Sequence, residues 1–362
     1  MPDLRKSGGP ATRWAVVLAG GIGSRFWPLS TPDRPKQLLP LVDREPLIAN
    51  AVRRLAPVAQ PVNTLVLTNS ELRDAMARAL PGIPSENVIA EPRPSGTAAA
   101  LTWAASEIVA RETAAGRSSN GVMICIHADW SIRDDAAFTA ALQQAADLAE
   151  AKSALVTVGI VPTRPDTGFG YIEPGAAAGA GFRVRRFIEK PDREGAKLLV
   201  SSGALWNSGI FCWRAADFLN EVRRHTPEIA PALERHAGAR GRSREEFFAF
   251  VKSISVDVGV LERSANILVV RGEFGWDDVG TWGALLRARA PDNAGNVAQG
   301  RTHLLESTNN VVHAEGGSIV LYGVRDLVVV SRPGLTLVTT VEKSEDLKTL
   351  VDSLPAEIKA GA

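Results

Sequence analysis

The stretch that decides the fold is WAVVLAGGIGSR, which occupies residues 14–25 of this 362-residue chain. It begins as a short apolar run rich in valine, which is typical of a buried strand, and it stops at three glycines. Glycines directly after a strand allow the backbone to approach a phosphate closely, so that successive N–H groups can surround the anion. Arg25 and Lys36 add positive charge where backbone groups alone do not neutralise a phosphorylated ligand. The stretch therefore predicts a phosphate-binding loop at the end of a strand.

Two other glycine-rich motifs are excluded by the same residues. A dinucleotide fingerprint requires a third glycine where Phe26 stands, and a P-loop requires Gly-Lys-Ser/Thr, which this loop lacks. A tight glycine turn with a surface arginine is the structural alternative. The additional Pro28-Leu29-Ser30 and Pro35-Lys36, at these spacings, favour the binding loop.

Beyond the loop, apolar strands alternate with helices. The expected strands cover residues 14–18, 64–68, 122–126, 154–160 and 182–188, and the expected helices cover residues 46–55, 71–79, 97–115 and 135–151. This alternation predicts an α/β fold, in which a Rossmann-like mixed, mostly parallel sheet carries helices on both faces.

The composition changes after about Arg289, where short strands follow one another closely with glycine turns between them. They are expected at residues 310–313, 318–322, 326–331 and 335–340, before a short helix at 344–353. We therefore divide the chain into a flexible tail at 1–12, a main domain at 13–289, and a small β-rich C-terminal extension at 290–362, which resembles a short left-handed β-helix.

Charge and cysteine content restrict the class of partner and compartment. The 41 Lys and Arg residues nearly cancel the 40 Asp and Glu residues, so no net field favours nucleic acid or an acidic membrane. Cys125 and Cys212 lie inside apolar runs and are expected to be buried thiols of a reducing compartment. The N-terminus lacks the pattern of a secretory signal, and no apolar run approaches the ~20 residues of a membrane span. We expect a cytoplasmic protein.

Further motifs follow the loop in order along nearly the whole chain. They are Ala128-Asp129, Gly170-Tyr171-Ile172-Glu173, Phe187-Ile188-Glu189-Lys190-Pro191, Trp206-Asn207-Ser208-Gly209, Ser255-Val256-Asp257, and Trp276-Asp277-Asp278-Val279-Gly280-Thr281-Trp282. As a set, the motifs resemble those of the sugar-1-phosphate nucleotidyltransferases. Their tryptophan-rich form, including Phe26-Trp27-Pro28-Leu29, narrows the resemblance to the mannose-1-phosphate guanylyltransferases, or GDP-mannose pyrophosphorylases.

This resemblance implies a reaction and a cofactor. GMP passes from GTP to α-D-mannose 1-phosphate, which gives GDP-mannose and pyrophosphate, with Mg²⁺ held by Asp129 and Asp278. The residue types agree, because Asp129 follows the expected strand at 122–126, at the edge where open α/β sheets bind ligands, and Mg²⁺ prefers carboxylate, water and phosphate oxygens. Asp277 is easily confused with Asp278, and an isolated aspartate at Asp129 could equally cap a helix or a turn.

The resemblance also assigns roles to other side chains. Arg25 and Lys36 would stabilise the triphosphate and the departing pyrophosphate, and Lys190 would hold the sugar phosphate. The nucleotide would lie on Leu18, Ala19, Gly20, Gly21, Gly23, Ser24, Glu91, Gly96 and Thr97. The sugar phosphate would lie on Gly170, Tyr171, Glu173, Glu189, Asn207 and Gly209.

Base selection is predicted at Glu91 and Gly96, which stand where thymidylyl and uridylyl relatives present a glutamine and a glycine. An ionised glutamate only accepts hydrogen bonds, and guanine offers two adjacent donors. The alternative is that Glu91 merely ends a strand before Pro92.

Two departures from the family pattern leave substrate preference open. Ser95-Gly96-Thr97-Ala98-Ala99-Ala100 replaces the usual Arg-Asn-Thr-Ala-Pro-Ala, and Trp130 follows the first metal aspartate. One rival is therefore the same chemistry with another pair, such as glucose 1-phosphate and UTP, dTTP or ATP. Another rival is an inactive regulatory sensor of sugar nucleotides, which would not need to keep the metal and leaving-group residues. A homodimer is compatible with the sequence, which does not fix the oligomeric state.

Overall fold

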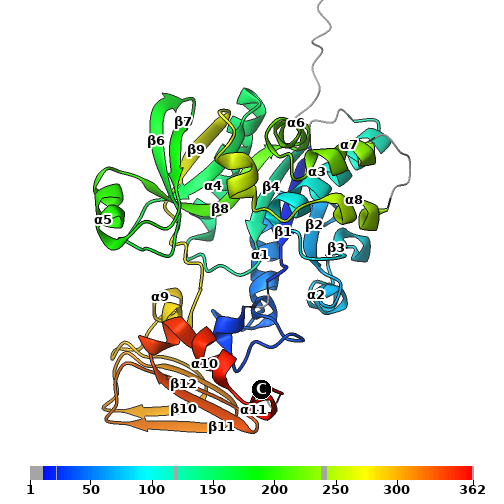
Figure 1. The fold of residues 1–362 in the computed structure, drawn as a ribbon. Helices are drawn as coiled ribbons and strands as arrows, with labels where there is room; N and C mark the ends of the chain where they lie inside the picture. The colour runs from blue at the N-terminus through cyan, green and yellow to red at the C-terminus, as the bar shows by residue number, and fades with distance from the viewer. Residues whose placement is uncertain (1–10, 22, 118–120, 238–242, 361–362) are drawn as a thin grey trace, which may run out of the picture. The chain divides into compact units, whose positions relative to one another are not determined.

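The computed structural model describes residues 11–21, 23–117, 121–237 and 243–360. The chain forms two compact units (Figure 1). Unit 1 comprises residues 1–20, 52–127 and 134–274, and unit 2 comprises residues 21–51, 128–133 and 275–362. Most of the tail predicted at residues 1–12 lies outside the described residues. The domain boundaries predicted at 13–289 and 290–362 stay a prediction. Most of the glycine loop belongs to unit 2, together with the C-terminal strands.

Unit 1 is built on a mixed sheet. Its strands are β1 (Arg13–Leu18), β2 (Thr64–Asn69), β3 (Val88–Glu91), β4 (Val122–His127), β5 (Leu155–Ile160), β6 (Tyr171–Ala178), β7 (Gly181–Ile188), β8 (Leu205–Arg214) and β9 (Ile267–Gly272). Among the described residues they lie in the order β3-β2-β1-β4-β8-β5-β9-β7-β6. The predicted α/β class with a mixed sheet is confirmed: β3, β2, β1 and β4 run parallel, whereas β8 runs antiparallel to both β4 and β5.

Most helices of unit 1 pack on its sheet or on one another. The helices of this unit are α2 (Arg73–Ala79), α3 (Thr97–Ala114), α4 (Asp135–Lys152), α5 (Arg193–Ser201), α6 (Ala215–His225), α7 (Ala230–Ala237) and α8 (Arg244–Phe250). β1 is buried along both faces from Trp14 to Leu18, which explains its continuous apolar run. α3 packs against β1, β2 and α6, and α4 packs against β4, β5, β8 and β9. No helix within the described ranges is both long and apolar enough to cross a membrane.

Both cysteines lie in this sheet. Cys125 on β4 and Cys212 on β8 are fully buried and unpaired, as the sequence predicted. Burial raises the pKa of Cys212 to about 12, so its thiol stays protonated and unreactive.

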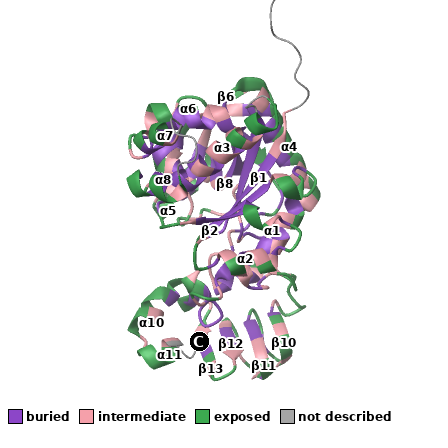
Figure 2. Cartoon of the chain, turned by 90° about the vertical axis from the view of Figure 1, so that its right-hand side faces the viewer, coloured by how far each residue is buried: buried purple, intermediate pink, exposed green. Residues whose placement is uncertain are grey.

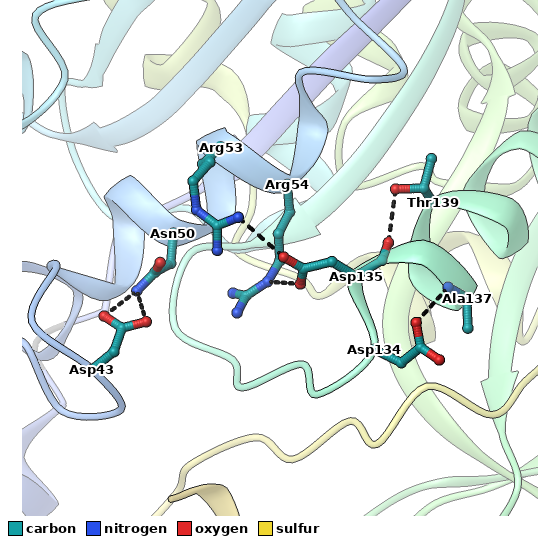
Figure 3. Close-up of polar contacts among 8 residues, drawn as sticks. All are labelled: Asp43, Asn50, Arg53, Arg54, Asp134, Asp135, Ala137 and Thr139. Carbon is teal, nitrogen blue, oxygen red and sulfur yellow. Dashed lines mark hydrogen bonds and ion pairs between the residues drawn. The ribbon is translucent and has the colours of Figure 1, made fainter.

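Side-chain contacts fix the start of α4 (Figure 3). Asp134 caps the helix and accepts a hydrogen bond from the N–H of Ala137 at 2.9 Å. Asp135 pairs with Arg53 and Arg54, at 3.0 and 2.7 Å, near the end of α1 (Leu47–Leu55). Since Arg54 is buried, these contacts hold the C-terminal end of α1 against the first turn of α4.

Unit 2 ends in a small β-domain, with strands β10 (Val297–Leu305), β11 (Val311–Tyr322), β12 (Leu327–Arg332) and β13 (Leu335–Thr340). β10 pairs in parallel with β11, and β11 with β12, whereas β13 closes the sheet as an antiparallel hairpin. The short helices α9 (Leu285–Ala288), α10 (Leu347–Ser353) and α11 (Ala356–Ala360) also belong to this unit.

The strands of this domain bend into a coil. β11 begins beside the start of β10, with Val311 opposite Val297. A straight strand of nine residues would span about 30 Å, and the chain from Leu305 to Val311 reaches at most about 20 Å. β10 must therefore turn, and the register shifts at Gly300. Gly300 has a φ of 91°, and a Cβ at this position would lie 2.2 Å from the carbonyl oxygen of Ala314, so a side chain is excluded. The predicted β-rich extension is confirmed, and its handedness stays a prediction.

The residues that follow the glycine loop belong to the core of unit 2. Phe26, Trp27 and Leu29, just after the loop, pack with Trp282 and with Val297, Val311 and Val328 of the β-domain. The rings of Phe26 and Trp282 lie 5.1 Å apart, and the indole of Trp282 donates to the carbonyl of Trp27 at 3.1 Å. Consecutive residues are buried at 311–313 of β11 and at 328–330 of β12, whereas most residues of β10 and β13 are half-buried or exposed (Figure 2). This core fixes the position of the loop within unit 2.

Replacing Trp282 with leucine is expected to destabilise unit 2 by about 2–4 kcal/mol, because the change leaves a cavity and breaks the bond to Trp27. Tyr322→Leu is the control: Tyr322 is 66% exposed, so its change should cost less than about 0.5 kcal/mol. Urea unfolding followed by circular dichroism measures both, and equal midpoints for the two variants would contradict the role of this core.

Candidate active site

In the glycine loop, two backbone carbonyls accept hydrogen bonds from side chains, whereas several backbone N–H groups are exposed and have no acceptor among the described residues. The amide of Gln37 donates to the carbonyl of Gly21 at 2.6 Å, and the hydroxyl of Ser30 donates to the carbonyl of Gly23 at 2.7 Å. Within the described part of the chain, nothing accepts a hydrogen bond from the N–H of Gly20, Gly21 or Ser24, and all three residues are exposed. A loop with unsatisfied N–H groups of this kind attracts anions.

Lys36 lies directly beneath this loop. Gly23 has a φ of 71°, and a Cβ at this position would lie 2.3 Å from the Cβ of Lys36, so only glycine fits. The Lys36 side chain is buried, and its Nζ donates to Asp129 Oδ2 and to the backbone carbonyl of Asp278, both at 2.9 Å. One ammonium group therefore joins three of the predicted site segments, all within unit 2.

The two candidate metal aspartates lie on paired segments. Ser131 and Asp277 exchange two backbone hydrogen bonds, at 2.9 and 3.0 Å, in an antiparallel bridge. This bridge brings the chain around Asp129 beside the turn that carries Asp278. Burial and the carboxylates of Asp277 and Asp129 raise the pKa of Asp278 to about 6, although Lys36 and Arg287 act in the opposite direction.

Asp277 and Asp278 differ in what they bind. Asp277 accepts from the N–H of Val279 at 2.9 Å through Oδ1, and from Nε of Arg287 at 2.8 Å through Oδ2. The carboxylate of Asp278 accepts no hydrogen bond from any residue that the structure describes. The geometry therefore favours Asp278 over Asp277 as the ligand.

The residues present fit a magnesium ion. Asp129 and Asp278 offer hard oxygen donors, and within the described ranges no group of three or more His, Cys, Asp or Glu side chains could enclose a metal. Mg²⁺ is commonly held by one or two carboxylates together with water and substrate phosphates. A dication would also offset the repulsion from Asp277 and Asp129, which adds to burial in raising the pKa of Asp278.

Glu91 lies near the start of the loop in unit 1. A Cβ placed on Gly20 would lie 4.0 Å from Oε1 of Glu91. Burial raises the pKa of Glu91 to about 7, so the carboxyl is poised to ionise when donors approach it. Gly96 and Thr97 contact the backbone of the segment 254–256. A Cβ on Gly96 would lie 2.3 Å from the carbonyl oxygen of Ile254, so only glycine fits there. The hydroxyl of Thr97 accepts a hydrogen bond from the N–H of Val256 at 2.9 Å.

Four of the predicted sugar-phosphate residues come together in unit 1. A Cβ on Gly170 would lie 2.9 Å from Oε2 of Glu189 and 3.6 Å from the Cβ of Asn207, so Gly170 leaves room between them. The N–H of Asn207 donates to the carbonyl of Gly170 at 2.8 Å, and Oδ1 of Asn207 accepts from the N–H of Gly209 at 3.3 Å. Lys190 follows Glu189 with a φ of 41° and pairs with it at 2.9 Å. Both side chains are more than half exposed, so this pair is weak and could exchange for a phosphate.

Two further residues of the predicted sugar-phosphate site, Tyr171 and Glu173, form polar contacts with other parts of unit 1. Tyr171 is buried, and its hydroxyl donates to the carbonyl of Asp166 at 2.8 Å. Glu173 on β6 forms a two-pronged ion pair with Arg186 on β7, at 2.8 and 3.0 Å. Among the described residues, no side-chain hydrogen bond or ion pair joins Tyr171 or Glu173 to Glu189 or Asn207. Arg25 is exposed, and no described residue forms a hydrogen bond or ion pair with it.

One residue was missed by the sequence analysis as a site residue. Asp257 accepts a hydrogen bond from Nδ2 of Asn207 at 2.7 Å through Oδ1 and so orients that amide. The motif Ser255-Val256-Asp257 was noted in the sequence, but only the contact with Asn207, fifty positions away, identifies its use.

Comparison with known proteins agrees with this geometry. The nucleotidyl transferase family profile matches residues 14–294. The mannose-1-phosphate guanylyltransferase of Escherichia coli K12 is 37% identical over 358 residues, which cover 95% of this chain and 74% of that protein. The chain belongs to the mannose-1-phosphate guanylyltransferases of the nucleotidyl transferase family.

Other relatives of this guanylyltransferase chain support the assignment. The Xanthomonas campestris strain B100 protein called xanthan biosynthesis protein XanB is 37% identical, with 94% of this chain and 72% of that protein covered. A crystal structure from Thermus thermophilus, described as a mannose-1-phosphate geranyltransferase, is 35% identical with a TM-score of 0.85 and covers 94% of this chain and 98% of that chain. The resemblance inferred from the motifs is confirmed.

Asp278→Asn tests the predicted metal site of this guanylyltransferase. We expect loss of more than about 99% of the turnover, because a neutral amide is a poor ligand for Mg²⁺. The fold should be unaffected. Because the folded-state pKa of Asp278 is raised, its ionised form costs stability as pH rises through about 6, and the neutral variant should match or exceed the native stability at pH 7. Turnover and thermal unfolding measure the two effects; near-normal turnover would transfer the ligand role to Asp277.

Lys190→Ala and Arg25→Ala should separate two phosphate contacts. Charge-assisted contacts are worth about 1.5–3 kcal/mol, or roughly ten- to a hundredfold in rate or affinity. Lys190→Ala should chiefly raise the KM for the sugar phosphate, and Arg25→Ala should lower kcat at saturating substrates. If Lys190→Ala changes only the KM of the nucleotide, the two roles are reversed.

Proposed function

We propose that this chain transfers GMP from GTP to α-D-mannose 1-phosphate, with formation of GDP-mannose and pyrophosphate. The observation that carries the proposal is the glycine loop with free N–H groups over Lys36, whose ammonium joins Asp129 to the Asp278 turn. The family to which the chain belongs performs nucleotidyl transfer, and its curated relatives include guanylyltransferases named for mannose 1-phosphate.

The reaction is an in-line displacement at phosphorus. An oxygen of the sugar phosphate attacks the α-phosphorus of GTP, a new phosphorus–oxygen bond forms, and the bond from the α-phosphorus to the bridging oxygen breaks. The electron pair leaves with pyrophosphate, so no covalent intermediate with the protein is required. Catalysis then depends on positioning and on charge stabilisation.

Positioning of the substrates and stabilisation of their charge are assigned to different residues. The loop N–H groups and Arg25 bind the triphosphate, and Lys36 stabilises charge on the departing pyrophosphate. Lys190 steers the attacking phosphate, while Glu189 and Asn207 accept or donate to the sugar hydroxyls. Mg²⁺ held by Asp129 and Asp278 would supply the positive charge that neutralises both phosphates.

The direct test is pyrophosphate release from GTP, UTP, dTTP and ATP, each combined with mannose 1-phosphate or glucose 1-phosphate. We expect the highest kcat/KM with GTP and mannose 1-phosphate. Preference for glucose 1-phosphate with UTP or dTTP would establish the related uridylyl or thymidylyl activity instead. No release with any pair would support the sugar-nucleotide sensor.

Glu91 is proposed to read the guanine base. An ionised carboxylate can accept both the ring N–H and the amino group of guanine, whereas uracil sets a carbonyl against it. Because the pKa of Glu91 is raised to about 7, the kcat/KM for GTP should rise between pH 6 and 8 as Glu91 ionises.

Glu91→Gln is expected to remove this pH dependence and to lower the GTP-to-UTP ratio of kcat/KM by about tenfold, because one accepting oxygen becomes a donor. Steady-state kinetics at pH 6, 7 and 8 check both effects. An unchanged ratio would mean that the base is read elsewhere, with the backbone groups of Ala19 and Gly20 as the next candidates.

A further inference from the structure

The turn that carries Asp278 contains backbone strain. Val279 adopts a φ of 47°, in the left-handed region that a β-branched residue rarely enters. Its side chain is fully buried in the unit 2 core with Phe26 and Trp282. The strain cannot relax without unpacking that core, so neighbouring contacts must hold the turn.

Asp277 holds this turn from two sides. Its backbone pairs with Ser131, and its Oδ1 accepts the N–H of Val279 at 2.9 Å, which stabilises the left-handed conformation. The Asp277 side chain is only 8% exposed, so a single conformation is imposed on it.

Arg287 fixes the remaining oxygen of Asp277. Its Nε donates to Oδ2 at 2.8 Å, and its own carbonyl accepts from Nη2 of Arg133. Arg133 ends the segment 128–133, which also carries Asp129. The contacts therefore close a ring that joins the Asp129 segment, Asp277 and Arg287 within unit 2.

We propose that Asp277 and Arg287 form a positioning pair that aims the carboxylate of Asp278, beside Asp129, at the divalent metal ion. Neither residue is a ligand in this proposal. With both oxygens of Asp277 engaged, Asp278 is the member of this acidic pair left to bind the metal, and its backbone carbonyl stays where Nζ of Lys36 bonds to it. The inference rests on the proposed function, because it requires the metal site assigned there.

Mn²⁺ binding, measured by electron paramagnetic resonance of the full chain with GTP, tests the pair without relying on turnover. Arg287→Met removes the ion pair, Asp277→Ala also removes the bond to Val279, and Asp277→Asn keeps an acceptor for that bond. Arg117→Met is the matched control, because Arg117 and Glu112 are 48% and 2% exposed, close to the 43% and 8% of Arg287 and Asp277.

We expect the Kd for Mn²⁺ to rise about tenfold in Arg287→Met and more in Asp277→Ala, as for other residues that orient metal ligands. Asp277→Asn should lose less Mn²⁺ affinity than Asp277→Ala does. Arg287→Lys should bind Mn²⁺ more tightly than Arg287→Met, because lysine keeps the positive charge. The KM for mannose 1-phosphate at saturating Mg²⁺ should change less than twofold. The control should bind Mn²⁺ as the native chain does, even if its thermal stability falls equally.

Three outcomes would overturn the proposal. Native Mn²⁺ affinity in both Arg287→Met and Asp277→Ala would show that the pair only stabilises the fold. An equal loss of affinity in Arg117→Met would attribute the effect to general destabilisation. Normal Mn²⁺ binding by Asp278→Asn would show that the assigned metal site is wrong.

Asp278→Asn, measured in parallel, also separates this inference from the proposed function. If Asp278→Asn loses Mn²⁺ affinity while Arg287→Met and Asp277→Ala keep it, the metal site stands and only the positioning role of the pair is wrong.

Discussion

The geometry of unit 2 depends on the buried ammonium group of Lys36. Removing a cation from water is costly unless it is paired and hydrogen-bonded, and Lys36 donates two of its three N–H groups, to the carboxylate of Asp129 and to the carbonyl of Asp278. The ring of Phe26, with its centroid 5.7 Å from Nζ, adds a favourable electrostatic contact. Segments that are distant in sequence are thus held together by one charge, which also lies under the loop proposed to bind phosphates.

Positive φ values recur beside the proposed ligand-binding residues. Gly23, Lys190 and Val279 all have positive φ values, and only the first is a glycine. Such conformations persist only where surrounding contacts impose them. For Gly23 the constraint is the stem of Lys36, and for Val279 it is the buried core together with Asp277. Lys190 adopts the same conformation at an exposed position next to Glu189, where the strained residue is itself the proposed phosphate ligand.

Much of this arrangement could be predicted from the sequence. The strand at 14–18, the glycine loop after it, and the alternation of strands and helices are local patterns, because a buried parallel strand needs a continuous apolar run and a close backbone approach needs glycine. β1 and β4 run parallel and end together at Leu18 and His127, so the loop and the segment with Asp129 leave the same edge of the sheet, as expected. The family motifs, spread over most of the chain, were sufficient to identify the nucleotidyl transferases.

The tertiary structure decided what local patterns could not. Adjacent acidic residues such as Asp277 and Asp278 look alike in sequence, and only the bridge to Ser131 and the bond from Arg287 determine which carboxylate is already engaged. The same holds for other polar contacts in unit 1. Glu173 pairs with Arg186, the buried Tyr171 donates to the carbonyl of Asp166, and Asp257 accepts from Asn207. The sequence by itself determined the fold class, the glycine loop and the family, because these follow from residue type and spacing. The partners of each polar side chain were decided only by the fold, because they depend on which distant groups packing brings within hydrogen-bond distance.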